Sequence, residues 1–156
     1  MSFSEKNMIE GVIIKKLSKY EDERGWLTEI FRNDEISVHP VMSYVSATKP
    51  GVTRGPHEHV HQTDVFVFIG PGSVELNLWD RRETSTTNGK NMKIEVGEDN
   101  PSMIIVPPGV VHAYRCISDK DAWCVNLPDK LYKGEGKKEE IDETRWENKT
   151  DSPYKF

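Results

Sequence analysis

Short apolar runs recur along the chain at nearly regular spacing, and Gly, Pro, Asn or Asp bounds most of them. The clearest pair, Val65–Ile69 and Val74–Trp79, is split by a Gly-Pro-Gly turn, as in a hairpin. No helical period extends beyond a couple of turns, so the pattern predicts an all-β antiparallel sandwich or barrel. The predicted strands are Met8–Leu17, Trp26–Phe31, Met42–Thr48, Val65–Ile69, Val74–Trp79, Met92–Val96, Met103–Val106, Val111–Ser118 and Trp123–Leu127.

A change of composition near the C-terminus divides the chain into two parts. The chain has 156 residues, which is enough for one domain with one core, and it contains neither a repeat nor a linker. From Lys133 onward the residues are dense in charge and poor in apolar side chains. We therefore expect a barrel over residues 1–132. Residues 133–156 are expected to form a surface segment on that barrel, anchored by Trp146 and Tyr154, and not a separate domain.

Charge and hydropathy restrict the partners. The net charge is −5, whereas binding to nucleic acid or to an anionic membrane needs a basic field. No apolar run approaches the ~20 residues of a membrane span, and the first residues, MSFSEKN, lack the apolar core of a signal peptide. We expect a cytoplasmic protein whose partner is a small molecule.

The two cysteines, Cys116 and Cys124, flank the turn at residues 118–121. They could face each other across a hairpin and form a disulfide. Two reduced, partly buried thiols are the favoured interpretation for a reducing cytoplasm. Neither cysteine has the spacing of a metal ligand.

Histidines mark two distant segments. His57, His59 and His61 follow Arg54, and His112 comes directly after a Pro-Pro-Gly turn. Residues two apart on a strand face the same side, so His57 and His59 should point together, with Arg54 on the other side unless the strand twists locally. His61 is interpreted as a turn residue. We expect the barrel to bring His112 to the HxH pair inside one cavity.

Two chemistries fit this cluster. Imidazole has an unperturbed pKa of about 6.5, so a neutral His57 could remove a proton from carbon beside a ketone. Alternatively, three imidazoles and one carboxylate (His57, His59, Asp64 and His112) could hold one divalent metal ion such as Fe, Ni, Mn or Zn. A base must stay free while a ligand is occupied, so His57 cannot serve both roles at once.

Four motifs then occur in a characteristic order. They are Asp22-Glu23-Arg24-Gly25 with Glu29, Gly51-Val52-Thr53-Arg54-Gly55-Pro56-His57, Asp80-Arg81-Arg82-Glu83-Thr84-Ser85, and Val106-Pro107-Pro108-Gly109-Val110-Val111-His112-Ala113-Tyr114. Together they resemble the motifs of the dTDP-4-dehydrorhamnose 3,5-epimerase family, whose fold is a cupin-type β-barrel, or jelly roll. The similarity runs along most of the chain.

The resemblance implies an epimerase or isomerase of dTDP-rhamnose biosynthesis that acts on a nucleotide-linked 4-keto-6-deoxy sugar. Protons at C3 and C5 would be removed and returned without a cofactor, and His57 would be the base. Arg24, Glu29 and Arg54 would hold the nucleotide diphosphate and base, and His59 and His112 would also contact substrate. The family forms homodimers in which N-terminal strands cross between partners.

Some positions depart from the family pattern. Asn126 stands where the family has its proton-donating tyrosine, which leaves Tyr114 and Tyr132 as nearby substitutes. Asp64 replaces the family's lysine, and HxH replaces H-x-Q. The carboxylate that orients the base in the family belongs to a C-terminal extension that this chain is too short to have. A metal-dependent cupin enzyme and a non-catalytic sugar-binding cupin therefore remain the alternatives.

Overall fold

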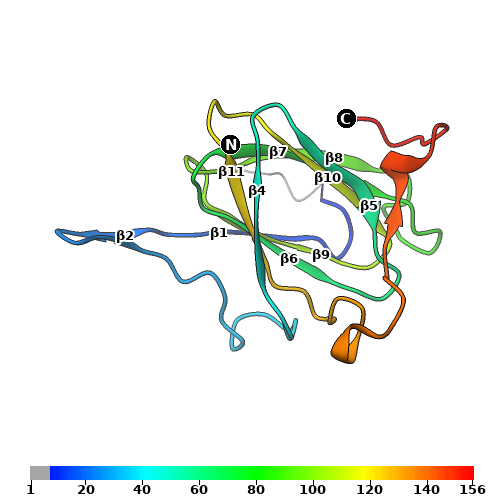
Figure 1. Cartoon of the computed structure of the whole chain (residues 1–156), viewed down its shortest axis with the longest axis horizontal. Coiled ribbons are helices and arrows are strands. Elements are labelled where there is room, and N and C mark those ends of the chain that lie inside the picture. The colour runs from blue at the N-terminus through cyan, green and yellow to red at the C-terminus, as the bar shows by residue number, and fades with distance from the viewer. Residues whose placement is uncertain (1–7) are drawn as a thin grey trace.

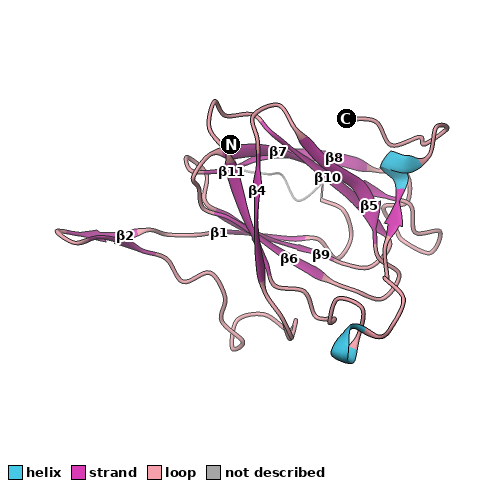
Figure 2. Cartoon of the chain, viewed as in Figure 1, coloured by secondary structure: helices cyan, strands magenta, loops and turns pink. Residues whose placement is uncertain are grey.

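The computed structural model describes residues 8–156, so the MSFSEKN segment lies outside the described part of the chain. Two five-stranded antiparallel sheets face each other and enclose the core (Figures 1 and 2). The strand orders are β1-β9-β6-β11-β4 and β12-β5-β10-β7-β8, and β2 pairs with β3 in a separate ribbon. The all-β prediction is confirmed.

The strands are β1 (Ile13–Lys16), β2 (Tyr20–Asp22), β3 (Gly25–Leu27), β4 (Tyr44–Thr48), β5 (Thr53–Glu58), β6 (Asp64–Phe68), β7 (Ser73–Asp80), β8 (Asn91–Gly97), β9 (Ser102–Val106), β10 (Val110–Cys116), β11 (Ala122–Asn126) and β12 (Thr144–Arg145). Two 3-10 turns, η2 (Glu135–Lys137) and η3 (Trp146–Asn148), lie in the C-terminal segment. Within residues 8–156, no helix has the length and apolar character that crossing a membrane requires.

Apolar side chains fill both faces of the first sheet. Phe66, Leu78 and Ile104 belong to the core between the sheets. Val65 and Ile105 point to the other face, where a second cluster forms under residues of the segment between β3 and β4. This double burial explains why β6 and β9 appear in the sequence as continuous apolar runs instead of alternating ones.

The ribbon of β2 and β3 extends away from the barrel (Figure 1). The predicted strand Trp26–Phe31 is shorter in the structure, where β3 ends at Leu27, and β2 was not predicted. Trp26 and Leu27 are exposed, because this part of the chain does not pack on the core. The ribbon therefore presents apolar side chains to the surroundings.

The C-terminal segment contacts the barrel through aromatic and polar side chains. Trp146 donates its indole N–H to Glu58 at 3.1 Å, and its ring lies 5.0 Å from that of Tyr154. The segment also adds a strand, because β12 pairs with β5. Cys116 and Cys124 are free and buried, which excludes a disulfide between them in this structure.

The Asp80–Ser85 motif stabilises the turn between β7 and β8. The Asp80 carboxylate is buried and accepts hydrogen bonds from Arg82 Nε at 2.8 Å and from the Ser85 and Thr87 hydroxyls, each at 2.6 Å. Arg82 also donates to the carbonyl of Glu10 at 2.6 Å, which links this turn to the N-terminal part of the chain. The motif is thus explained by local structure.

Candidate active site

Neighbouring strands of one sheet bring the histidines together. β5 pairs with β10, and His57 and His112 are register partners. Their ring centroids are 4.4 Å apart, and the His59 ring lies 5.9 Å from His57 and 5.7 Å from His112. Directly opposed residues in an antiparallel pair have Cβ atoms about 5 Å apart, which accounts for this contact. The expected convergence of the two segments is present.

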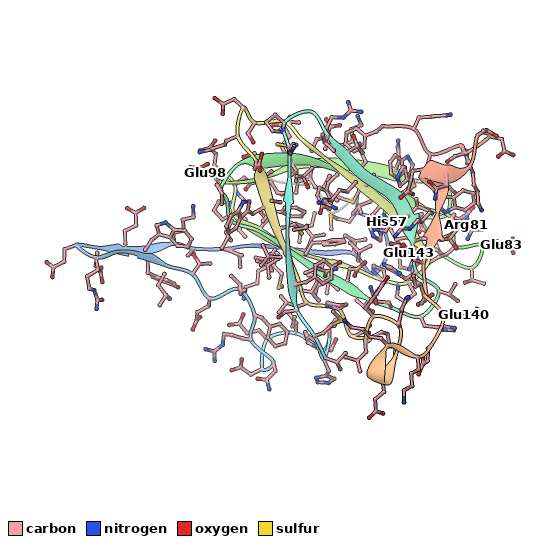
Figure 3. All side chains as sticks on the ribbon, viewed as in Figure 1. His57, Arg81, Glu83, Glu98, Glu140 and Glu143 are labelled. Carbon is pink, nitrogen blue, oxygen red and sulfur yellow. The ribbon has the colours of Figure 1, made fainter. Side chains whose placement is uncertain are left out.

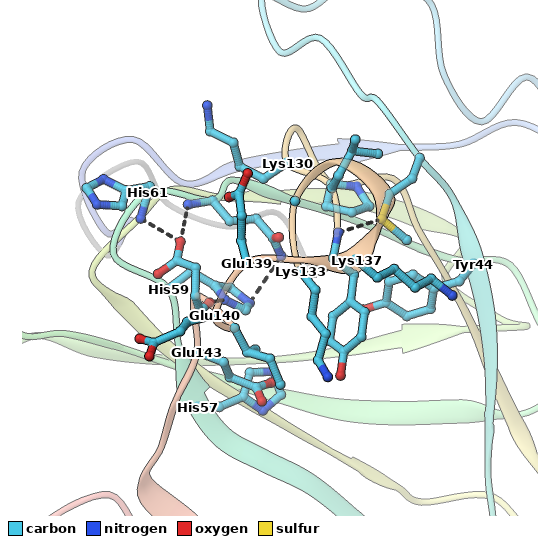
Figure 4. A pocket seen from close by; sticks show the side chains of 18 of the residues that line it. Tyr44, His57, His59, His61, Lys130, Lys133, Lys137, Glu139, Glu140 and Glu143 are labelled. Atoms are coloured by element: carbon cyan, nitrogen blue, oxygen red, sulfur yellow. Dashed lines mark hydrogen bonds between the residues drawn. The ribbon is translucent and has the colours of Figure 1, made fainter.

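A cavity of about 940 Å³ opens beside these rings, at the end of the barrel opposite the ribbon (Figures 3 and 4). His57 and His59 line one wall, Tyr44 of β4 another, and residues 128–145 supply much of the remainder. A smaller cavity of about 410 Å³ adjoins it and is lined by Arg54 and Tyr114. His57 and Tyr44 line both cavities, so they stand at the boundary between them.

Asp64, the first residue of β6, is the buried charge at the centre of the site. Its Oδ2 lies 3.1 Å from His59 Nε2 and 3.4 Å from His112 Nε2. Its Oδ1 accepts hydrogen bonds from Gln62 Nε2 at 2.9 Å and from Asn126 Nδ2 at 2.8 Å. The carboxylate side chain is only 1% exposed, so these neighbours replace water as its partners.

The two deeper histidines have their Nδ1 atoms committed to backbone carbonyls. His112 Nδ1 donates to the Val110 carbonyl at 3.0 Å, and His59 Nδ1 donates to the Asp142 carbonyl. Their Nε2 atoms therefore face Asp64. His112 Nε2 is buried and, despite its distance to Asp64, makes no hydrogen bond of acceptable geometry.

His59 faces an oxygen acceptor at each ring nitrogen. Burial alone would lower its pKa, but the hydrogen bond and the negative charge of Asp64 outweigh burial and raise the pKa of His59 to about 9. The same contact lowers the pKa of Asp64 against the opposing effect of burial. At neutral pH the His59–Asp64 pair is therefore an imidazolium and a carboxylate.

His57 has the opposite electrostatic environment. Burial, followed by the charges of His112 and His59, lowers the pKa of His57 to about 2. The imidazole is consequently neutral at pH 7 and has a lone pair with which to accept a proton. The structure thus places one neutral and one protonated imidazole next to each other on β5 and the loop that follows it.

The same residues also fit a metal ion. His57, His59 and His112 each offer one ring nitrogen, and the three atoms lie within 4.8 Å of one another. Asp64 adds a carboxylate oxygen beside two of them. The backbone hydrogen bonds at Nδ1 of His59 and His112 orient those rings in the way that is usual for metal-binding histidines.

The C-terminal segment supplies a part of the site that the sequence did not reveal. The Asp142 carboxylate accepts the backbone N–H groups of Val60 and His61 at 2.8 Å each and of Gln62 at 3.0 Å. Glu143 lines both cavities. A carboxylate of the C-terminal segment therefore reaches the site, and the contacts of Asp142 are with His59 and the loop that follows it. That this chain lacks the family's carboxylate that orients the base remains a prediction.

Two of the expected substrate-binding residues, Arg24 and Glu29, lie away from the cavities of their own chain. Arg24 is on the ribbon with its side chain 84% exposed, and Glu29 follows β3 and pairs with Arg32 at 3.3 Å. Neither lines a cavity beside His57. Arg54 does line the smaller cavity, where its Nε donates to Thr48 Oγ1 at 2.8 Å. One chain therefore assembles Arg54, His57, His59 and His112.

The tyrosine that is hydrogen-bonded to Asn126 is Tyr44, and not one of the two suggested substitutes, Tyr114 and Tyr132. Tyr114 is buried, and its hydroxyl lies 3.0 Å from Ser46 Oγ. Tyr132 lines the large cavity. The sequence pattern did not single out Tyr44, whose hydroxyl accepts a hydrogen bond from Asn126 Nδ2 at 2.9 Å. No local signal could have done so, because the contact depends on β4 lying beside β11.

Known proteins with similar sequences and folds agree with this description. The family model for dTDP-4-dehydrorhamnose 3,5-epimerase matches residues 6–147. The chain is 39% identical over 113 residues to the spore coat polysaccharide biosynthesis protein SpsL of Bacillus subtilis (strain 168), covering 72% of this chain and 74% of SpsL. It is 37% identical over 135 residues to the probable low-salt glycan biosynthesis epimerase Agl13 of Haloferax volcanii, covering 85% and 86% respectively.

The solved structure of a dTDP sugar isomerase from Desulfovibrio desulfuricans G20 superposes with a TM-score of 0.81 at 23% identity, covering 94% of this chain and 91% of that one. This match confirms the cupin-type jelly-roll fold. The family match and the sequence relatives carry the assignment beyond the fold. The chain belongs to the dTDP-4-dehydrorhamnose 3,5-epimerase family and is a sugar-nucleotide epimerase.

Proposed function

We propose that the protein epimerises a dTDP-linked 4-keto-6-deoxy sugar next to its ketone, with His57 as the base. The observation that carries the proposal is the position of His57, a neutral imidazole on the wall shared by both cavities. A general base must reach the substrate carbon with a free lone pair at the working pH. Among the three clustered histidines, His59 and His112 are the ones whose ring nitrogens turn toward Asp64.

The neighbours of His57 complement the reaction. Removal of a proton beside a ketone leaves negative charge on the ketone oxygen, and a nearby positive group stabilises that enolate. The His59 imidazolium, held by Asp64, is such a group. Proton transfer to His57 creates a second imidazolium close to the first. The enolate charge would offset this repulsion, so His57 becomes a competent base only with substrate bound.

Basic side chains can hold the nucleotide diphosphate. Arg54 lies next to His57 in the smaller cavity, and Lys130, Lys133 and Lys137 line the larger one. A guanidinium matches two phosphate oxygens at once, and lysines add positive charge. The cytoplasmic location and the role in dTDP-rhamnose biosynthesis remain predictions.

A homodimer would give Arg24 and Glu29 a role. Both lie on or next to the ribbon, which extends away from the barrel (Figure 1), and the ribbon exposes Trp26 and Leu27. A ribbon that packs on a second copy would bury these apolar side chains and carry Arg24 toward the partner's cavity. Light scattering coupled to size-exclusion chromatography tests this proposal, and a monomer at micromolar concentration would contradict it.

Deuterium exchange tests the proposed function. In deuterated water, the parent protein should introduce deuterium at C3 or C5 of dTDP-4-keto-6-deoxyglucose, and His57→Asn should reduce this rate about 10²–10⁴-fold. His61→Asn is the matched control, because His61 is an exposed turn residue of the same segment. Equal exchange by the parent and His57→Asn would exclude His57 as the base. Absence of exchange by the parent would favour a sugar-binding protein.

A metal-dependent cupin activity is the second candidate, favoured by the closeness of His57, His59 and His112 to one another and of Asp64 to two of them. A bound divalent ion would polarise the substrate carbonyl as a Lewis acid. Elemental analysis of protein purified without added metal or an affinity tag separates the candidates. One equivalent of Fe, Ni, Mn or Zn would support the metal site, and less than a tenth of an equivalent would contradict it.

A further inference from the structure

Tyr44 stands across from Asn126 at the mouth of the barrel. The two residues are register partners in the β4–β11 pair, and Asn126 Nδ2 lies 2.9 Å from the Tyr44 hydroxyl. Tyr44 also lines both cavities together with His57, and Figure 4 shows the two side chains bordering the same space. The phenol is therefore available to whatever molecule contacts His57.

The direction of the Asn126 hydrogen bonds leaves the Tyr44 proton free. An ionised carboxylate only accepts hydrogen bonds, so the Asn126 amide must turn its NH₂ group toward Asp64 Oδ1, which lies 2.8 Å away. The second hydrogen of this NH₂ group then points to the Tyr44 oxygen. Because Tyr44 is the acceptor in this bond, its own O–H remains available to a group in the cavity.

The surroundings of Tyr44 favour the protonated form of its phenol. Burial, and after it the negative charge of Asp64, raises the pKa of Tyr44 to about 12. Tyr44 is therefore protonated at neutral pH and can donate its hydroxyl proton to a group in the cavity.

We infer that Tyr44 is the proton donor of the epimerisation and that Asn126 positions its hydroxyl group. The inference rests on the proposed function. His57 takes the proton from the carbon beside the ketone, and the C–H electron pair moves into the enolate. Tyr44 then transfers its proton to the opposite face of that carbon, which inverts the centre. Water reprotonates the phenolate and accepts the proton from His57, so the reaction needs no co-reactant.

The other two tyrosines near the site are less suited to this role. Tyr114 is 5% exposed, and its hydroxyl lies within hydrogen-bonding distance of Ser46 in the interior. Tyr132 lines the large cavity but not the smaller one. The Lys133 ammonium lies 5.9 Å from the centroid of the Tyr132 ring. Tyr132 is therefore a matched control for the loss of a phenol from the same cavity.

Tyr44→Phe should separate proton removal from inversion. In deuterated water, His57 can still remove a proton and return a deuteron to the same face, so exchange at C3 or C5 should stay within about tenfold of the parent rate. Formation of the epimerised sugar should fall about 10²–10⁴-fold, the usual contribution of a general acid. Tyr132→Phe should change the rates of exchange and of epimer formation by the same factor, whereas Tyr44→Phe should change their ratio.

Two results would overturn the inference. One is a Tyr44→Phe protein that forms the epimer within threefold of the parent rate. The other is a Tyr44→Phe protein with the parent's melting temperature that loses exchange and epimer formation equally.

If Tyr44→Phe does not fold, Asn126→Ala serves instead, because it keeps the phenol but removes the amide that positions it. It should slow epimer formation at least about tenfold with exchange retained, and a parent-like rate of epimer formation would contradict the inference. Failure of the proposed function would look different. In that case the parent protein would show no exchange, or His57→Asn would exchange at the parent rate.

Discussion

Asp142 offers a sharp test of how the C-terminal segment supports the site. Its carboxylate accepts the N–H groups of three consecutive residues, Val60 to Gln62, and its carbonyl accepts a hydrogen bond from His59 Nδ1. Hydrogen bonds to charged groups contribute about 1.5–3 kcal/mol each when buried. Asp142 is half-buried, so water can replace its carboxylate as the acceptor in the variant. Each of the three hydrogen bonds should therefore contribute about 1 kcal/mol to the free energy of unfolding. Asp142→Ala should therefore cost about 3 kcal/mol.

For a domain of this size, 1 kcal/mol corresponds to about 2–4 °C in Tm, so Asp142→Ala should melt roughly 6–12 °C below the parent. Asp142→Asn keeps an acceptor oxygen and should lose about half as much. Circular dichroism melting curves measure both. The exchange rate of Asp142→Ala should also fall about tenfold at a temperature where it is folded, because small displacements of catalytic groups are costly.

Asp151→Ala is the control, since it removes the same charge from an exposed position of the same segment. Exposed substitutions usually change stability by less than about 0.5 kcal/mol. If Asp142→Ala melted within 1 °C of Asp151→Ala, the carboxylate would not hold the loop that follows His59. The C-terminal segment would then not orient His59 through this carboxylate.

Other expected outcomes concern the turn, the phosphate site and the barrel anchor. Hydrogen bonds from Arg82 and neighbouring hydroxyls lower the pKa of Asp80 despite its burial, so its contribution to stability is present above an unfolded pKa of about 3.8 and is lost as pH falls below it. Asp80→Asn should cost about 3 kcal/mol at pH 7 in urea titrations and show a smaller loss on acidification; an unchanged pH profile would refute this assignment. Arg54→Ala should weaken dTDP binding about tenfold in calorimetry and reduce its salt dependence, and unchanged affinity would remove Arg54 from the phosphate site. Trp146→Phe, which deletes the N–H that Glu58 accepts, should lower Tm by about 3 °C, whereas an unchanged Tm would show that this bond does not anchor the segment.

Strands and the convergence of the histidines could be predicted from the sequence, because they depend on local sequence patterns. Period-two alternation and turn residues located strands such as Val74–Trp79, which the structure extends by one residue at each end. The HxH spacing and the Pro-Pro-Gly turn before His112 predicted imidazoles that converge, and cross-strand pairing of β5 with β10 produces that contact. Each of these features is encoded within a few neighbouring residues, so one sequence is enough to predict it.

Long-range contacts could not be predicted in the same way. Asp142 is one acidic residue among many in a charged segment, and its three backbone contacts lie about 80 residues away. Tyr44 acquires its place only because β4 pairs with β11, which no periodicity reveals. The positions of Arg24 and Glu29 depend on a ribbon that extends away from the barrel (Figure 1). Their expected role in substrate binding depends on the proposed homodimer.

The proposed mechanism requires the sugar to bind between His57 and Tyr44, at the boundary of the two cavities. A crystal structure with the bound 4-keto sugar nucleotide, or with an analogue reduced at C4, would show whether it does. We expect C3 or C5 about 3–3.5 Å from a ring nitrogen of His57, with the Tyr44 hydroxyl on the opposite face of the sugar ring. A sugar bound away from His57, or with both residues on one face, would contradict it.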